Sequence, residues 1–142
     1  MSLQINFISI TDQNPIKALC RILEQKYLYQ NFMILRTTSE DLQEEINEVL
    51  WTFSKKSFIP HGSKFDEQPE KQNLYITTGG EIPNNASILI LYNLFGFNNY
   101  DVKYFKEIIL IFDNNNSLIV TEAREFYKKL KNENYQLGFS KI

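Results

Sequence analysis

The chain has 142 residues, of which 43% are hydrophobic, 14% aromatic and 23% charged, with a formal net charge of −2 at pH 7. This is the length of one domain and the composition of a folded protein, and the mild negative charge argues against a surface that grips nucleic acid throughout. One cysteine, Cys20, and one histidine, His61, exclude an internal disulfide and any site built from several of either residue. No apolar run reaches the roughly 20 residues of a membrane span, and the N-terminus lacks the pattern of a signal peptide, so we expect a soluble, cytoplasmic protein.

Hydrophobic periodicity predicts an alternation of strands and helices. In chain order we expect a strand at Gln4–Ile10, a helix from Pro15, a strand at Phe32–Leu35, a helix after Thr38 or Ser39, strands at Leu74–Thr77 and Ile88–Tyr92, a short helix within Asn98–Lys106, a strand at Glu107–Phe112, a helix over about Ser117–Asn134 and a short strand within Gln136–Ser140. The stretch between Ser54 and Asn73 reads as a polar surface loop that contains His61. The alternation indicates an α/β domain with a mostly parallel sheet and helices on both faces, and the absence of a linker indicates one domain over residues 1–142.

Residues that would support catalysis or cofactor binding are scarce. The first strand–helix junction, residues 10–15, contains no glycine, so it lacks the loop that a nucleotide phosphate needs. Cys20 falls on the apolar stripe of the first helix and reads as a core residue. His61 has no partner at a recognisable catalytic spacing. We therefore expect no catalytic residue, no metal and no cofactor, and a nucleotide-binding enzyme is the less favoured alternative.

Large apolar residues gather where the second helix runs into the loop, namely Trp51, Phe53, Phe58 and Ile59. Aromatic residues at such a position often mark a protein–protein contact. They can equally fold inward beneath the loop, and the residues alone leave the two interpretations open.

The last helix combines a core-facing stripe with a basic edge. The stripe consists of Ile119, Ala123, Phe126 and Leu130. One position along, Arg124 and Tyr127 lie at the edge of that face near Lys128, and Phe112 ends the preceding strand. An arginine beside an aromatic ring suits a C-terminal peptide, whose carboxylate and last hydrophobic side chain are recognised together. A solvated basic face is the competing interpretation, which the residues by themselves favour, and direct nucleic-acid binding by the lysines of this helix is a further alternative that the acidic balance disfavours.

Four segments resemble one known family, the chi subunit of bacterial DNA polymerase III, and one of them, Ala18-Leu19-Cys20-Arg21, is similar to the family's early helix. Leu50-Trp51, followed after five residues by Ser57-Phe58-Ile59-Pro60-His61, is similar to its most specific motif. The run from Ala123 to Lys128 resembles the family's last helix, and Gly138-Phe139 resembles its chain end. The order of strands and helices also fits over nearly the full length.

The resemblance implies a Rossmann-like three-layer domain that acts in DNA replication as a non-catalytic accessory subunit of the clamp-loader assembly. Such subunits bind the psi subunit through one surface and the C-terminal tail of single-stranded-DNA-binding protein through another, and meet nucleic acid only indirectly. By position, the resemblance assigns the psi-facing surface to Trp51, Phe53, Phe58, Pro60 and His61, and the tail pocket to Phe112, Arg124, Tyr127 and Lys128. For the last helix, the resemblance favours a peptide-binding pocket over the solvated basic face that the residues by themselves favour. A repair helicase that uses the psi-facing surface is the alternative partner.

Overall fold

The computed structural model describes residues 3–28, 32–53, 61–62 and 73–142, with the backbone alone for residues 26–28, 53 and 61. In chain order its elements are β1 (Gln4–Ile10), α1 (Pro15–Leu28), β2 (Met33–Arg36), α2 (Glu40–Phe53), β3 (His61–Gly62), β4 (Leu74–Thr77), β5 (Ile88–Tyr92), α3 (Asn99–Tyr104), β6 (Glu107–Asp113), α4 (Ser117–Asn132) and β7 (Leu137–Lys141). Every predicted strand and helix is present, with small shifts at the ends.

The strands form one sheet in the order β3-β4-β2-β5-β6-β1-β7. The mostly parallel sheet expected from the sequence is confirmed, and all of the pairings are parallel. The expectation for His61 is wrong in one respect, because its backbone lies in the short edge strand β3 and not in a loop. His61 and Gly62 pair with Leu74 and Tyr75 of β4, which gives the main-chain groups at that edge of β4 a partner.

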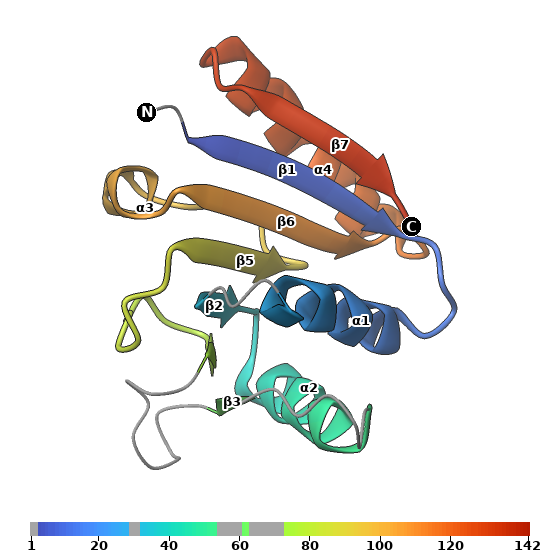
Figure 1. Ribbon diagram of the computed structural model, residues 1–142. Helices are drawn as coiled ribbons and strands as arrows, with labels where there is room; N and C mark the ends of the chain where they lie inside the picture. Colours follow the sequence, from blue (N-terminus) through green and yellow to red (C-terminus); the bar gives the residue numbers. More distant parts are fainter. Residues whose placement is uncertain (1–2, 29–31, 54–60, 63–72) are drawn as a thin grey trace.

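Helices cover both faces of the sheet (Figure 1). α1 and α2 pack on one face over a core in which Leu19, Leu23 and Ile46 are fully buried. α4 and the segment that leads into α3 cover the other face, where Ala123 and Leu130 are buried. The fold is therefore the three-layer α/β arrangement that the alternation of strands and helices predicted.

Cys20 belongs to the core beneath α1 and α2. Its side chain is fully buried, and burial raises the pKa of the thiol to about 12. The thiol therefore stays protonated at physiological pH, which agrees with the interpretation of Cys20 as a small core residue.

Polar side chains fix where α2 and α4 begin. The Ser39 hydroxyl accepts a hydrogen bond from the Leu42 N–H at 3.2 Å, so Ser39 is the N-cap of α2. At α4, the Asn116 side chain accepts hydrogen bonds from the second and third N–H groups of the helix at 3.0 and 3.2 Å. This cap sets the register of α4 and so decides which of its side chains face the sheet.

A buried ion pair joins β2 to α3. Arg36 donates two hydrogen bonds to the carboxylate of Asp101, at 2.9 and 3.0 Å, and the two residues are 7% and 2% exposed. The same carboxylate accepts the Asn98 N–H at 3.1 Å, which completes the N-terminal cap of α3. β2 ends one residue later than predicted because this pairing allows a charged residue to lie inside the sheet.

Candidate functional site

A cleft of about 630 Å³ lies between α4 and the carboxyl-terminal halves of β6, β1 and β7. These strands end side by side at the right of Figure 1, with α4 behind β1 and β7. Ligands of parallel α/β sheets commonly bind beyond this edge. The lining residues are Phe7, Ser9, Phe112, Asn114, Val120, Ala123, Arg124, Tyr127, Lys128, Phe139 and Lys141.

The floor of the cleft is aromatic and comes from the paired strands β1 and β6. Phe7 of β1 and Phe112 of β6 are 1% and 4% exposed, so their rings belong to the core as much as to the cleft. Phe112 meets Phe95 edge-on at 5.9 Å between ring centroids. Phe7 packs edge-on against Tyr127 at 5.2 Å, which ties α4 to the sheet.

One wall of the cleft is the sheet-facing side of α4. Ala123 is buried against the sheet, and Arg124, Tyr127 and Lys128 follow at helical spacing. Arg124 and Lys128 are four residues apart and therefore lie on the same side of the helix. Arg124 is exposed and Tyr127 is half-buried, so the wall presents a cation at the rim and a ring below it. The structure thus brings Phe112, Arg124, Tyr127 and Lys128, the residues assigned to the tail pocket, into one cleft.

The other wall comes from β7, the edge strand next to β1. Phe139 pairs in register with Phe7, and Lys141 pairs with Ser9, so these side chains share the face that α4 covers. Phe139 is 60% exposed, although it is a large apolar residue. Sequence reasoning placed a strand here but missed both residues as part of the site. The sequence places Leu137, Phe139 and Lys141 at alternate positions, which puts them on one face of a strand. That this face contributes to the cleft can be recognised only once β7 is known to pair with β1.

The chemistry of the cleft is that of a binding site for an apolar group that carries negative charge. Its floor consists of aromatic rings, and its rim carries the cations of Arg124, Lys128 and Lys141. None of its lining residues is Asp, Glu, His or Cys. A carboxylate at the rim can therefore pair with a cation while a hydrophobic side chain enters between the rings.

The second predicted surface is described only in part. Trp51, in the last turn of α2, is 58% exposed. Phe58 and Pro60 lie outside the described residues, as do the side chains of Phe53 and His61. Upstream of Trp51, the exposed face of α2 is acidic, with Glu44, Glu45 and Glu48. The exposure of Trp51 favours the interface interpretation of that residue over burial beneath the loop.

Within the described ranges, no group of three or more His, Cys, Asp and Glu side chains is placed to hold a metal ion. None of the helices described is both long and apolar enough to cross a bilayer.

The fold and the cleft together define an α/β binding domain whose site suits a carboxylate attached to an apolar group. The chain matches the family described as "DNA polymerase III chi subunit, HolC" over residues 2–138. It is also similar to a protein of Rickettsia prowazekii (strain Madrid E), "Probable DNA polymerase III subunit chi". The two are 46% identical over an alignment of 117 residues, and the alignment covers 78% of this chain and 70% of the relative.

The chain therefore belongs to the DNA polymerase III chi subunit family, and the resemblance inferred from its motifs is confirmed. A chi subunit is an accessory subunit of DNA polymerase III and not its catalytic subunit. The protein is thus a component of the replication machinery.

Proposed function

We propose that the protein is an adaptor that links the DNA polymerase III clamp-loader assembly to single-stranded DNA coated by single-stranded-DNA-binding protein. The cleft between α4 and β7 binds the acidic C-terminal tail of the coating protein. Membership of the chi family supports the assignment to the polymerase. The observation that carries the assignment to the cleft is its aromatic floor beneath a rim of three cations and no acid. As part of the replication machinery, the protein acts in the cytoplasm.

In this proposal the two parts of the cleft recognise two parts of the peptide end. Arg124 pairs with the terminal carboxylate, with Lys128 one helical turn away adding positive charge. Phe112 and Tyr127 enclose the last hydrophobic side chain above Phe7. A single contact of this size is weak, and many tails along coated DNA raise the effective concentration enough for useful tethering.

Replacing Arg124 with alanine tests the assignment. Binding of an acidic peptide that ends in Pro-Phe should weaken by about tenfold, because the terminal carboxylate loses its charge-assisted hydrogen bonds. Isothermal titration measures the effect, and added salt should weaken binding to the wild type more than to the variant.

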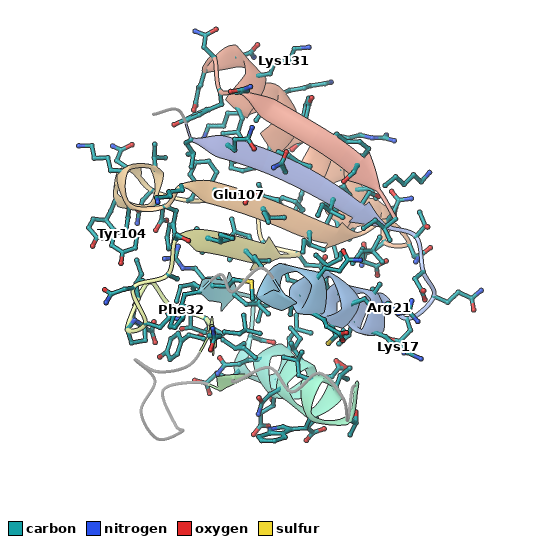
Figure 2. All side chains as sticks on the ribbon, viewed as in Figure 1. Lys17, Arg21, Phe32, Tyr104, Glu107 and Lys131 are labelled. Atoms are coloured by element: carbon teal, nitrogen blue, oxygen red, sulfur yellow. The ribbon has the colours of Figure 1, made fainter. Side chains whose placement is uncertain are left out.

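Lys131→Ala is the matched control, since it removes a positive charge from α4 at a position that does not line the cleft. Figure 2 shows Lys131 at the opposite end of α4 from the carboxyl ends of β1 and β7. This variant should bind the peptide like the wild type. Equal affinity of the Arg124 variant and the wild type would contradict the proposed pocket.

The proposal includes a second docking surface around Trp51 for a psi-type partner in a heterodimer. Its support is the exposure of Trp51 at the end of α2 together with membership of the chi family. A repair helicase that docks on the same surface is the second candidate partner. Tryptophan is among the residue types that contribute most to binding in protein interfaces, which supports a partner contact at this position.

A further inference from the structure

The connection between β5 and α3, residues 93–98, is fastened to the strand that carries Phe112. The Asn93 N–H donates a hydrogen bond to the Ile111 carbonyl at 2.9 Å, and the Asp113 N–H donates one to the Asn93 side-chain oxygen at 2.9 Å. These bonds hold the start of the connection against the residues before and after Phe112. The other end of the connection is the capping box of α3. Hydrogen bonds therefore fix both ends of this connection.

Phe95 of the connection lies against the floor of the cleft without lining it. Its ring meets the ring of Phe112 edge-on, with 5.9 Å between the ring centroids and 65° between the ring planes. It also lies 6.4 Å from the ring of Phe126 on α4. Phe112 is a lining residue of the cleft, whereas Phe95 and Phe126 are not. Phe95 thus supports the Phe112 ring from outside the cleft.

We infer that Phe95 is a positioning residue, which holds the Phe112 ring in place and so sets the preference of the cleft for a large apolar last side chain. The inference rests on the proposed function and adds to it a specificity determinant outside the cleft. A ring that is packed on its far side has no space into which it can move when a ligand presses on it. Phe112 then loses little freedom on binding, and the affinity gained from its contact with the ligand is kept.

This role concerns the last side chain of the peptide and not its carboxylate. In the proposed function the carboxylate pairs with Arg124 at the exposed rim, whereas Phe112 and Phe95 pack in the core on the same face of the sheet. Loss of the Phe95 ring should therefore affect a peptide whose last side chain reaches Phe112. A peptide that ends in alanine keeps the carboxylate and lacks that contact. The ratio of the two affinities isolates the contribution of the last side chain.

Phe95→Leu tests the role with two acidic peptides that differ only in the last residue, which is Phe in one (the Phe peptide) and Ala in the other (the Ala peptide). NMR titration measures both dissociation constants. The variant should bind the Phe peptide about threefold more weakly than the wild type does, because the Phe112 ring must now be ordered on binding. It should bind the Ala peptide as the wild type does, so the preference for phenylalanine falls about threefold.

Phe97→Leu is the matched control, two residues further along the same connection. The Phe97 ring packs on Phe126 and Tyr135, at 5.6 and 6.3 Å between ring centroids, and neither of these residues lines the cleft. Phe95 and Phe97 are both half-buried, so the two leucine variants should lower the thermal midpoint by similar amounts. Phe97→Leu should keep the wild-type preference for the Phe peptide. Phe95→Tyr, which retains the ring, should also keep it.

A measurement on the wild type is independent of how well any variant folds. The ring resonances of Phe95 should shift when the Phe peptide binds, since its ring contacts the Phe112 ring. They should stay in place when the Ala peptide binds. Phe95 resonances that respond equally to the two peptides, or to neither, would overturn the inference.

The outcomes separate the role of Phe95 from the function on which it rests. If Phe95→Leu weakens binding of both peptides by the same factor, Phe95 has only a structural role and the inference is wrong. If Arg124→Ala weakens binding of the Phe peptide while Phe95→Leu leaves the preference unchanged, the proposed function stands and the role of Phe95 is wrong. If neither peptide binds the wild type, both are wrong.

Discussion

Asp101→Ala should lower the free energy of unfolding by about 3–5 kcal/mol, the cost typical of removing one partner from a buried ion pair. The substitution leaves the guanidinium of Arg36, which is 7% exposed, without its two charge-assisted hydrogen bonds. It also removes the acceptor for the Asn98 N–H, which is one of the two hydrogen bonds in the N-terminal capping box of α3. Urea denaturation followed by circular dichroism measures the change as a shift of the midpoint.

Two further variants make the result specific to the ion pair. Glu44→Ala removes an exposed carboxylate from α2 and should change stability by less than about 0.5 kcal/mol. Combining Arg36→Met with Asp101→Leu should recover much of the loss, because apolar side chains replace both buried charges. A loss below about 1 kcal/mol for Asp101→Ala would show that the pair is not the connection between β2 and α3 described above.

Trp51→Ala should reduce the recovery of polymerase III subunits with this protein from cell extract, through an affinity loss of about 30-fold or more. Tryptophan residues at the centre of an interface typically contribute about 2 kcal/mol or more to binding, and about 1.4 kcal/mol corresponds to tenfold. The side chain is 58% exposed, so stability should change little. Affinity purification with quantitative mass spectrometry measures recovery.

Tyr100→Ala is the control for this experiment, since Tyr100 is an exposed aromatic residue on α3 with 62% of its surface accessible. It should leave recovery unchanged. Equal recovery with the wild type and Trp51→Ala would remove the second docking surface from the proposal. Recovery of a helicase in place of polymerase subunits, lost on Trp51→Ala, would favour the alternative partner.

The helix wall of the cleft was accessible to sequence reasoning because it depends on local periodicity. The stripe on the last helix placed Arg124 and Tyr127 beside the buried face, and the strand before it ended at Phe112. A helix that follows a parallel strand packs back on the same sheet, so these residues had to lie near each other. The structure shows in addition that Phe112, Arg124 and Tyr127 line one cleft.

The strand wall depends on contacts between the two ends of the chain. Phe139 enters the cleft because β7 pairs with β1, in a register that aligns it with Phe7. Periodicity within a five-residue strand carries no information about its partner or register. The ion pair between Arg36 and Asp101 was missed for a related reason. A charged residue after an apolar run predicts the end of a strand, unless the distant partner of that charge is known.

The account is tested most directly by following amide chemical shifts of the wild-type protein during titration with an acidic peptide that ends in Pro-Phe. Shift changes should cluster on both walls of the cleft, at Ser9, Arg124, Tyr127, Phe139 and Lys141. An otherwise identical peptide with an amidated terminus should produce weaker changes around Arg124. Changes that gather instead on the acidic face of α2, or a spectrum that the peptide leaves unaltered, would contradict the claim that this cleft binds a peptide terminus.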